Sequence, residues 1–304
     1  MTPLSQMILE NHQIRKTKKQ KTAFIELMRK YHPELTVQEG GLLKSRNIII
    51  GNPKKADVIL TAHYDTCSVL PVANFITPQQ PLFTVLYSLV LVIPIFLLVL
   101  LLNIGLNAIS NLPWLLHYFI SIALYFGLLA LLVFGPANKH TANDNTSGVV
   151  TLCEILDRLP EPLRQKTAVV FFDHEETGLF GSQFFRKKNK KKMESKLLIN
   201  FDCVSDGDFF LLAATKEARQ LYGEQIEKAF VSTEEKTVLI NKMEKVYYPS
   251  DHAGFPVAVA VAALKHKPYI GYYIDRIHTN RDTMFDERNI DFLCTGVHSF
   301  LESL

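Results

Sequence analysis

The feature of this sequence that most constrains its fold is a long stretch without formal charge. No Asp, Glu, Lys or Arg occurs from Thr66 to Asn138, although such residues are common on both sides. Two apolar runs lie within the stretch, Leu82 to Leu102 and Leu112 to Phe134, and the more polar segment Asn103 to Asn111 connects them. A helix needs about 20 residues, at 1.5 Å rise each, to cross the core of a bilayer. Each run is therefore long enough to span a membrane.

We interpret the two runs as a transmembrane helical hairpin. The alternative is a pair of buried core helices or an apolar lid, but core helices usually keep charged residues on their outer face, and these runs have none. Pro94 predicts a kink in the first helix. The expected organisation is a hairpin at residues 82–134, inserted into one soluble domain formed by residues 1–81 and 135–304.

Both ends of a hairpin lie on the same side of the membrane, so the two parts of the soluble domain share one compartment. The connector lacks Lys and Arg, whereas Lys139 and the basic body of the chain follow the second run. By the positive-inside tendency, we expect an integral membrane protein with two spans and a soluble domain that faces the cytoplasm. Met1 to Phe24 contains no apolar stretch long enough for a secretion signal, and we expect an amphipathic surface helix there, through about Arg29.

Composition excludes some functions and bounds the architecture. The net charge of +3, from 33 basic and 30 acidic side chains, gives no reason to expect a nucleic-acid partner. The 304 residues suffice for one α/β domain and an insertion. The four cysteines are widely separated, which favours buried thiols in a reducing compartment over a disulfide framework. The basic run Lys187 to Lys192 is expected to be a solvated loop, or else a contact to anionic lipid head groups.

Outside the hairpin, β-rich runs alternate with helical periodicity, which is typical of an α/β fold. The expected strands are Asn47–Ile50, Val58–Ala62, Ala168–Phe172, Leu197–Phe201 and Val257–Ala263, the last of which could also be helical. Apolar residues recur at helical spacing from Val149 to Leu159, after a possible cap at Thr146 or Ser147. Pro160 would end this helix, which is expected to begin directly after Asn143-Asp144-Asn145.

Polar residues that can bind metal ions stand at the ends of several expected strands. His63 and Asp65 follow the run Val58 to Leu60, and side chains two apart on an extended strand share a face. Imidazole is a common zinc ligand that a carboxylate can orient, although an ordinary hydrogen-bonded pair is the commoner meaning of such a motif. Asp144, at the expected helix start, is either an N-cap or a carboxylate that bridges two cations.

Three further segments add to this set. Glu175 and Glu176 follow the strand that ends at Phe172, where neighbouring carboxylates repel unless cations or solvent neutralise them. One of them could bind a metal ion while the other moves protons. Asp202 ends another strand, and His278 lies in a polar turn. The five strand-end and turn positions offer two imidazoles and three carboxylates, a set suited to a pair of zinc ions.

The chain resembles the co-catalytic zinc exopeptidase family, which includes bacterial leucyl aminopeptidase and glutamate carboxypeptidase. Five segments carry the resemblance, in the order in which the family has them: Ala62-His63-Tyr64-Asp65-Thr66, Ala142-Asn143-Asp144-Asn145-Thr146-Ser147-Gly148, Glu175-Glu176-Thr177-Gly178-Leu179-Phe180-Gly181-Ser182, Asn200-Phe201-Asp202 and His278-Thr279-Asn280-Arg281-Asp282-Thr283. The similarity covers most of residues 45–304 apart from the hairpin. It implies an α/β fold in three layers, with a mostly parallel mixed sheet between helices.

The resemblance also implies which residues bind two zinc ions. One ion would be held by His63 and Asp202, and the other by Glu176 and His278. Asp144 would bridge the two ions. A complete set of these ligands is present in the sequence, which is what a pair of ions requires.

Other residues would act beside the metals. By the same resemblance, Asp65 would orient His63, and Glu175 would be the general acid and base. Ser250-Asp251-His252 resembles a family segment near the substrate, where His252 would either polarise the scissile carbonyl or make a structural hydrogen bond.

The predicted function is a membrane-anchored aminopeptidase that removes N-terminal residues from peptides. As a hypothesis, the ion pair lowers the pKa of a water molecule toward neutrality, and Glu175 takes its proton and delivers it to the leaving amine. One alternative is a carboxypeptidase or dipeptidase of the same family, with Arg276 or Arg281 holding a terminal carboxylate. Others are a glutaminyl cyclase, which works with one zinc ion, and a catalytically inactive membrane receptor or scaffold.

Overall fold

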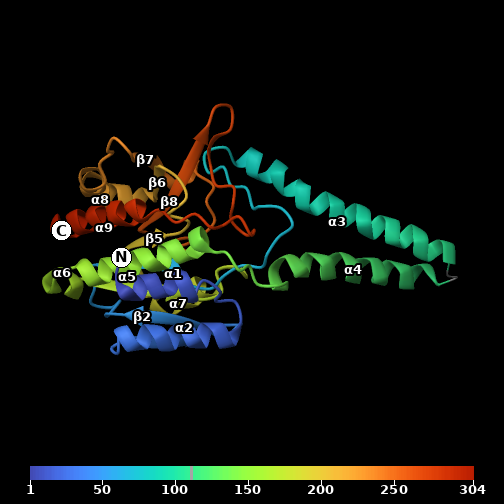
Figure 1. Cartoon of the computed structure of the whole chain (residues 1–304), viewed down its shortest axis with the longest axis horizontal. Coiled ribbons are helices and arrows are strands. Elements are labelled where there is room, and N and C mark those ends of the chain that lie inside the picture. The colour runs from blue at the N-terminus through green and yellow to red at the C-terminus, as the bar shows by residue number, and fades with distance from the viewer. Residues whose placement is uncertain (110–111) are drawn as a thin grey trace.

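The computed structural model describes residues 1–109 and 112–304, and a mixed β-sheet of nine strands forms its centre (Figure 1). The strands are β1 (Thr36–Gly40), β2 (Ser45–Ile50), β3 (Val58–His63), β4 (Thr167–Phe172), β5 (Leu197–Phe201), β6 (Phe209–Ala214), β7 (Thr237–Lys242), β8 (Ala258–Lys267) and β9 (Gly271–Tyr273). Their order is β1-β2-β4-β3-β5-β8-β6-β7, and β9 pairs with β8. The central strands β4, β3, β5 and β8 run parallel to one another. The predicted α/β class with a mixed sheet is confirmed.

Helices cover both faces of this sheet. Their bounds are α1 (Pro3–Asn11), α2 (Lys18–Tyr31), α5 (Gly148–Arg158), α6 (Glu161–Gln165), α7 (Phe180–Met193), α8 (Lys216–Ala229) and α9 (Glu287–Glu302), with the short turns η1 (Ala142–Ser147) and η2 (Met243–Lys245). Helices α1, α2, α5, α8 and α9 share one hydrophobic core against one face, and α7 packs on the other. The body therefore has three layers.

The strand β3 shows why the central strands have continuous apolar sequences: both faces of the sheet are buried there. Its side chains alternate between the two cores: Val58 and Leu60 face the helices of the larger layer, whereas Ile59 faces Phe185 and Met193 of α7. All five of these side chains are buried. Burial of one such aliphatic side chain contributes about 1.5–3 kcal/mol to the stability of the fold. Both helical layers therefore stabilise this strand.

The expected strands are all present, and Val257–Ala263 belongs to a strand rather than a helix. The expected helix from Val149 to Leu159 is α5, but the predicted cap is wrong. The hydroxyl of Ser147 donates to the backbone oxygen of Asn143 at 2.7 Å instead of capping the helix. The side chain of Asn145 caps the start of the helix instead, because its Oδ1 accepts a 3.0 Å hydrogen bond from the N–H of Gly148.

The amino-terminal segment differs from the single surface helix that the sequence predicts. Two helices, α1 and α2, are separated by a short linker, and a capping box between Thr17 and Gln20 starts the second. Arg15 lies in the linker with a fully buried side chain. Its guanidinium donates hydrogen bonds to the backbone oxygen of Tyr64 and to the hydroxyl of Thr146. This basic residue therefore cross-links the end of β3 to η1.

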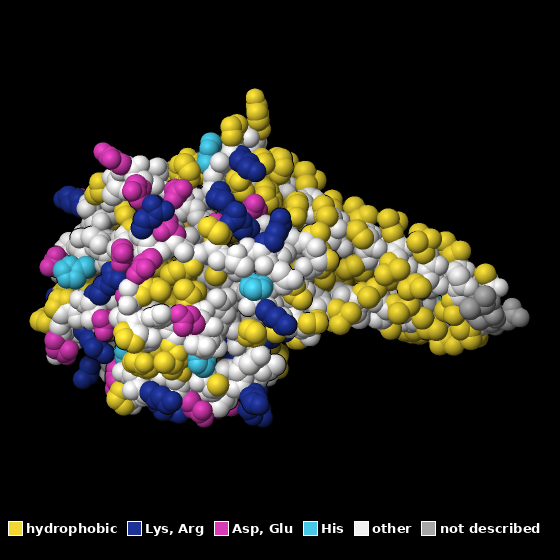
Figure 2. Space-filling view, in the orientation of Figure 1, with side chains coloured by type: hydrophobic (Ala, Val, Ile, Leu, Met, Phe, Trp, Pro, Cys, Tyr) yellow, Lys and Arg dark blue, Asp and Glu magenta, His cyan; other side chains and the backbone are white. Residues whose placement is uncertain are grey.

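The two long apolar helices are α3 (Pro81–Ile109), which contains Pro94, and α4 (Trp114–Phe134), and they project from one end of the body (Figure 1). Only 6% of the most apolar part of each helix is buried, so neither is a core helix of this chain. Charged side chains cover the body, whereas the projection is almost entirely apolar (Figure 2). By length and composition, each helix could cross a membrane. The expected connector from Asn103 is helical to Ile109, and Ser110 and Asn111 lie outside the described residues.

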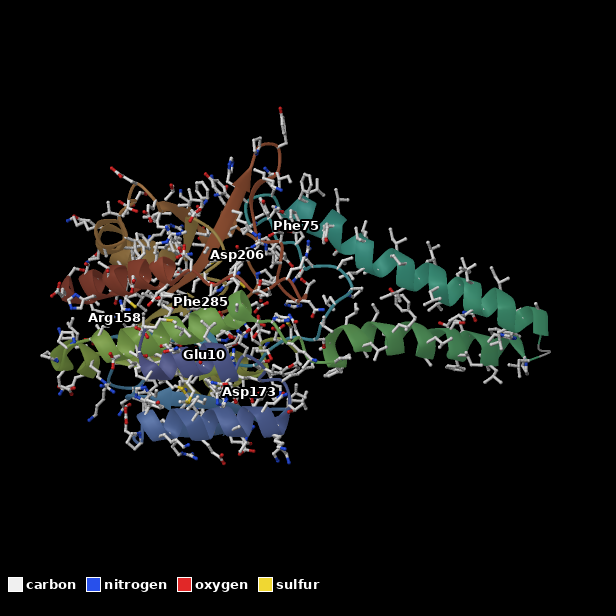
Figure 3. All side chains as sticks on the ribbon, in the orientation of Figure 1. Glu10, Phe75, Arg158, Asp173, Asp206 and Phe285 are labelled. Atoms are coloured by element: carbon white, nitrogen blue, oxygen red, sulfur yellow. The ribbon has the colours of Figure 1, made fainter. Side chains whose placement is uncertain are left out.

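The base of this projection is tied to the body by polar and aromatic contacts. The ammonium group of Lys16 donates a 2.7 Å hydrogen bond to the backbone oxygen of Val133, at the end of α4. Phe75, beside the start of α3 in Figure 3, stacks on Tyr273 of β9 with ring centroids 5.5 Å apart. It also contacts Tyr87 of α3 at 5.0 Å. Both helices are thus anchored close to the edge of the sheet.

The basic run Lys187–Lys192 is not a solvated loop, because it forms the second half of α7. Lysine is a good helix former, and the apolar side chains of Phe185 and Met193 bury one side of the helix while Lys187 and Lys188 remain exposed. The side chains of Lys191 and Lys192 lie outside the described part of the chain. The four cysteines are free and buried, as expected.

Candidate metal centre

Parallel strands bring three of the predicted site segments to one edge of the sheet. His63 is the last residue of β3, Glu175 and Glu176 follow β4, and Asp202 follows β5. These strands are neighbours and run in the same direction, so their carboxyl ends meet. The backbone turns back at once after β4, through a hydrogen bond from the N–H of Gly178 to the oxygen of Glu175. Gly178 has a φ of 122°, which favours glycine.

Two loops deliver the remaining residues to the same edge. Asp144 lies in η1, between the hairpin and α5, and His278 lies in the loop after β9. Asp282 ties the two loops together, because its carboxylate accepts hydrogen bonds from the backbone N–H groups of Asn143 at 2.8 Å and Asp144 at 3.0 Å. Its own backbone oxygen accepts from Ala142 at 3.1 Å.

The two carboxylate oxygens of Asp144 face two different histidines. Oδ1 lies 3.3 Å from Nε2 of His63, and Oδ2 lies 3.0 Å from Nε2 of His278. Asp202 Oδ1 lies 3.6 Å from the first ring, and Glu176 Oε2 lies 3.4 Å from the second. The structure therefore brings all five predicted ligands into one cluster, with Asp144 at its centre.

The donor atoms lie close enough together to hold metal ions. One group that can hold an ion is formed by His63, Asp144 and Asp202, whose donor atoms lie within 4.8 Å of one another. A second group contains Glu176 and His278. Within the described chain, Oε1 of Glu176 is buried and has no hydrogen-bond partner, so it is free to bind a cation. Nitrogen and oxygen donors in this arrangement suit zinc.

Close packing of the carboxylates and imidazoles in the cluster shifts their pKa values. Burial lowers the pKa of His63, but Glu175, Asp144 and Asp202 together raise it well above its usual value. Burial raises the pKa of Glu176 well above its usual range, and the charge of Asp144 adds to this effect. Buried carboxylates crowded together in this way favour a cation between them.

Asp65 contacts both the first histidine and the turn that carries the glutamates. Nδ1 of His63 lies 3.1 Å from the backbone oxygen of Asp65 and 3.8 Å from its carboxylate. The carboxylate instead accepts hydrogen bonds from the backbone N–H groups of Glu175 at 3.0 Å and Glu176 at 3.3 Å. The expected contact to the ring is thus made by the carbonyl, which favours the tautomer with a free Nε2.

Glu175 lines the pocket over the cluster without belonging to the five residues around Asp144. Burial raises the pKa of its carboxyl well above the usual range; His63 opposes this shift, and Glu176 adds to it. A carboxyl group whose pKa is raised in this way is a better proton acceptor than an exposed one. Its position and its pKa both suit a proton carrier.

The pocket has a volume of about 310 Å³ and contains all five cluster residues. Its walls come from several loops, with Asn74, Ile76, Gly178, Leu179, Cys203, Tyr248, Pro249 and Ile277 completing the lining. Neither Lys nor Arg is among the described residues that line it. A pocket of this size admits a few side chains or the end of a peptide rather than a folded protein.

His252 lies beside this pocket and lines an adjoining hollow, which shares Tyr248 and Pro249 with it. Its ring is parallel to that of Tyr248, with centroids 6.5 Å apart. Burial lowers the pKa of His252 to about 4, so the ring is neutral at physiological pH. The hydroxyl of Tyr248 donates to the backbone oxygen of Asp202 at 3.0 Å, which connects His252 to the cluster through Tyr248.

Sequence reasoning quoted three further residues of the site in its motifs but gave them no role. Ser250 donates a 2.6 Å hydrogen bond to Asp202 Oδ2 and thereby orients that carboxylate. Asp251 is fully buried, its carboxylate oxygens have no hydrogen-bond partner among the described residues, and burial raises its pKa to about 7. Asp282 positions Asp144, as shown above, and was quoted in a motif without a role. All three stand in motif segments that the sequence analysis quotes, and this was the available signal.

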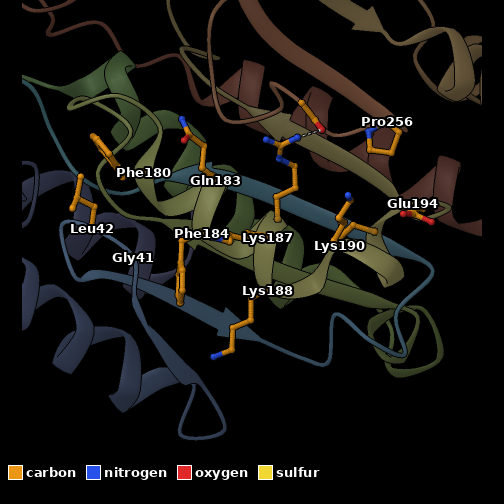
Figure 4. A pocket seen from close by; sticks show the side chains of 13 residues that line it. Gly41, Leu42, Phe180, Gln183, Phe184, Lys187, Lys188, Lys190, Glu194 and Pro256 are labelled. Carbon is orange, nitrogen blue, oxygen red and sulfur yellow. Dashed lines mark hydrogen bonds between the residues drawn. The ribbon is translucent and has the colours of Figure 1, made fainter.

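A larger hollow of about 910 Å³ lies away from the cluster, over α7 (Figure 4). Lys187, Lys188 and Lys190 of the basic run line it, together with apolar side chains such as Phe180 and Phe184. Arg186 and Gly254 also line it, and the guanidinium of Arg186 donates a 2.8 Å hydrogen bond to the backbone oxygen of Gly254. None of the five cluster residues lines this hollow.

Comparison with known proteins gives one family match. The sequence model of peptidase family M28 matches residues 129–292, more than half of the chain, and this range contains Asp144, Glu175, Glu176, Asp202 and His278. No curated protein matches the sequence.

Several solved structures are similar in fold. A glutaminyl cyclase from Porphyromonas gingivalis has a TM-score of 0.59 at 16% identity, over 99% of this chain and 96% of that one. A glutaminyl cyclase from Macrostomum lignano has a TM-score of 0.53 at 11% identity, over 98% and 87%. A zinc aminopeptidase from Bacillus subtilis has a TM-score of 0.48 at 15% identity, over 85% and 49%. At such identities the two cyclases show a shared fold and nothing about the substrate.

Proposed function

The chain belongs to peptidase family M28, and from this premise we propose that it is an exopeptidase with two zinc ions, specifically an aminopeptidase, anchored in a membrane by α3 and α4. The family match supports the predicted resemblance at the level of an M28 peptidase. The observation that carries the proposal is the position of Asp144, whose two oxygens face His63 at 3.3 Å and His278 at 3.0 Å. A carboxylate placed between two imidazoles in this way is suited to bridge two cations.

Each ion would have its own ligands besides the shared carboxylate of Asp144. His63 and Asp202 would hold one ion, and Glu176 and His278 the other; the group of His63, Asp144 and Asp202 and the closeness of Glu176 to His278 support this division. Zinc bound there would supply a nucleophilic water at neutral pH and would polarise the peptide carbonyl. The chain's part is to hold these ligands rigidly, through strand ends and through the hydrogen bonds that fix Asp144.

Glu175 would carry the proton in this reaction. It lines the pocket beside the cluster, and Asp65 fixes the backbone of its turn through the 3.0 Å hydrogen bond to its N–H group. Because its pKa is raised, Glu175 can accept a proton from the attacking water and release it to the leaving amine. Asp65 thereby positions both Glu175 and the ring of His63.

The charges around the pocket favour a free amino end over a free carboxyl end. The described lining includes four carboxylates and neither Lys nor Arg. Neither of the two arginines that could hold a terminal carboxylate lines the pocket: Arg276 contacts Asp206 at 3.4 Å, and Arg281 is exposed. An α-ammonium group is therefore the better partner, which supports an aminopeptidase over a carboxypeptidase.

Glutaminyl cyclisation is the second candidate, because two of the similar structures are glutaminyl cyclases. The fold does not separate the two activities, since it serves both. The donor set does offer a distinction: two groups of ligands around Asp144 can hold two ions, whereas a cyclase works with one. The metal content of the protein therefore distinguishes the candidates.

The proposal is tested with full-length protein purified in detergent. The wild type should hold about two zinc ions per chain and should release the first residue of peptides with a free amino end, but not of N-blocked peptides. Glu175→Gln should retain the zinc and lose turnover by at least ~100-fold, which is the scale of general-base catalysis. The exposed Glu227→Gln serves as the matched control and should behave as the wild type. One zinc ion with cyclisation of N-terminal glutamine would refute the aminopeptidase, and full activity of Glu175→Gln would remove this residue from the mechanism.

The proposed membrane anchor rests on the exposure of two uncharged helices. An apolar projection of this size is unstable in water, since solvent-exposed apolar patches on soluble proteins are much smaller. Residues 82–134 would form the anchor, residues 1–81 and 135–304 the peptidase domain, and the positive-inside tendency places that domain in the cytoplasm. The backbone N–H groups of the neighbouring residues Val69 and Leu70 donate to Pro136, just after α4, and to His278 of the pocket, so the pocket would lie close to the lipid surface.

The anchor is tested by fractionation of cells that produce the full chain. The protein should remain with the membranes after a carbonate wash and should dissolve in detergent. Replacement of residues 82–134 by a short flexible linker should release it into the soluble fraction. Release of the full chain by carbonate would contradict a membrane span, and protection of the peptidase domain from protease in sealed inside-out vesicles would contradict the cytoplasmic side.

A further inference from the structure

The second half of the metal centre contains a donor that the five-residue set does not include. We propose that Cys67 supplies a thiolate ligand to the ion held by Glu176 and His278. This inference rests on the proposed two-zinc centre and adds a sulfur atom to one of its two sites. The centre would then be asymmetric, with nitrogen and oxygen donors at the site of His63 and Asp202 and a softer donor set at the other.

The geometry of three side chains supports this assignment. Sγ of Cys67, a carboxylate oxygen of Glu176 and a ring nitrogen of His278 all lie within 4.8 Å of one another. The carboxylate and the ring are already 3.4 Å apart. In a tetrahedral zinc site with bonds of about 2.0–2.3 Å, neighbouring donors are about 3.3–3.8 Å apart. If each of the three donor atoms moved by about 1 Å or less, all three could bind one zinc ion.

The surroundings of the sulfur atom point to a ligand rather than to core packing. Cys67 is only 2% exposed, yet it lies beside charged groups and belongs to none of the hydrophobic clusters. Independently, Oε1 of Glu176 is buried without a hydrogen-bond partner in the described chain, and the side chain of this residue is 7% exposed. A buried carboxylate oxygen left without a partner next to a thiol and an imidazole is a site prepared for a cation.

The side chain of Asn138 lies next to the sulfur atom of Cys67. Its side-chain amide lies 3.8 Å from Sγ of Cys67 and also donates to the backbone oxygens of His140 at 2.6 Å and Thr279 at 3.0 Å. The two N–H bonds of this amide are taken by the two oxygens, and the sulfur is a longer third contact of the same nitrogen. The amide thus joins the cysteine to the loop that carries His278.

The additional ligand changes what each ion can do. With Asp144, Glu176, His278 and Cys67, one site would have four protein donors, the number that structural zinc sites have. The other site would keep fewer protein donors and would remain open to substrate. When the sulfur binds the ion, the thiol proton is released to solvent and no electrons are transferred. The fully ligated site should consequently hold its ion more tightly than its neighbour and should favour soft ions such as cadmium.

The location of Cys67 links this site to the hairpin. Its backbone oxygen accepts a 3.1 Å hydrogen bond from the N–H of Asn138, so the ligand lies where the chain enters and leaves the two apolar helices. Cys67 is therefore placed to connect the metal centre to the anchor.

X-ray absorption of the zinc-loaded full-length protein in detergent tests the proposal without any variant. The expected spectrum contains a sulfur shell at ~2.3 Å, at one sulfur per two zinc ions, beside the nitrogen and oxygen shell. About two zinc ions without a sulfur shell would overturn the ligand while leaving the proposed function intact. Absence of stoichiometric zinc would instead overturn the proposed function.

Cobalt substitution identifies the cysteine. Wild-type protein loaded with Co²⁺ should show a thiolate-to-cobalt charge-transfer band in the near ultraviolet, and Cys67→Ser should lose this band while still binding cobalt at the site of His63. Cys294→Ser, which removes a buried thiol in α9, is the matched control and should keep the band. Loss of the band in Cys203→Ser but not in Cys67→Ser would overturn the assignment, because Cys203 also lies near the cluster.

Discussion

The carboxylate of Asp282 accepts a 3.0 Å hydrogen bond from the backbone N–H of Asp144. A second hydrogen bond, from the N–H of Asn143 at 2.8 Å, makes the contact bidentate. Because Asp282 lies four residues after His278, the contact fixes the distance between a histidine ligand and the shared carboxylate. It is an interaction between two loops that are more than a hundred residues apart in the sequence, and the symmetry of Asp144 between the two rings depends on it.

Asp282→Ala should weaken zinc binding without removing any proposed ligand. Loss of a group that orients a metal ligand typically costs 10–100-fold in affinity. The change should be measured as the zinc dissociation constant, by competition with a chromophoric chelator. Asp282→Asn keeps one acceptor oxygen and should lie between the wild type and the alanine variant. Equal affinity in all three proteins would show that the two loops hold Asp144 without this contact.

Arg15→Ala should destabilise the whole domain. The guanidinium is fully buried and donates to the backbone oxygen of Tyr64 and the hydroxyl of Thr146, so its removal leaves buried acceptors without partners. We expect a loss of about 3 kcal/mol, which lowers Tm by about 6–12 °C in a domain of this size. Thermal unfolding of the detergent-solubilised protein measures it. The exposed Lys19→Ala is the control and should shift Tm by no more than about 2 °C.

Glu154 predicts a dependence of stability on pH that is independent of the metal centre. Its carboxylate accepts hydrogen bonds from Thr2 N at 2.6 Å and from Arg158 Nη2 at 2.9 Å. Although burial acts in the opposite direction, these and neighbouring donors lower its pKa from 4.5 to about 2. Because the pKa is lower in the folded state, this stabilisation is complete above about pH 4.5 and is lost as the pH falls toward about 2.

The expected size of this effect is modest. Allowing for solvent screening, Glu154→Gln should lower the free energy of unfolding by about 1–2 kcal/mol at pH 7. The difference from the wild type should shrink as the pH falls through this range, in unfolding curves recorded at several pH values. Glu227→Gln, at an exposed position of α8, is the control and should unfold as the wild type does. A difference that is constant from pH 7 to pH 3 would assign the loss to packing instead of charge.

The sequence predicts best what local patterns determine. His63 and Asp202 could be located because each ends an apolar run, and parallel strands necessarily bring such ends together. Arg15 could not, because it stands among lysines in the sequence and only the tertiary fold encloses it. The proposed role of Cys67 could not be predicted for a related reason: its sequence neighbours suggest an ordinary buried thiol, and Glu176 and His278, which the fold brings beside it, are more than a hundred positions away.

The strands β6 and β7 and the helices α8 and α9 also went unpredicted, although Phe209–Ala214 is a continuous apolar run. Such a run is compatible with either a buried strand or a buried helix segment, and its antiparallel pairing with β8 settles the choice. The basic run in α7 was predicted to be a loop and is a helix. Its charge suggests a loop, but Phe185 and Met193 give it one buried side, and this side decides the structure.

Removal of zinc should destabilise the folded protein. The cluster packs several buried carboxylates together, and Oε1 of Glu176 is left without a partner in the described structure, so a cation is the missing counter-charge. A ligand that binds only the folded state stabilises it by about 2.7 kcal/mol at a free concentration of about 100 times Kd. Treatment with a chelator should therefore lower Tm by several degrees, and added zinc, but not magnesium, should restore it. His278→Ala should retain only part of this zinc-dependent shift, because the site of His63, Asp144 and Asp202 remains. If Tm were unaffected by both chelator and zinc, these side chains would be held together by protein contacts alone.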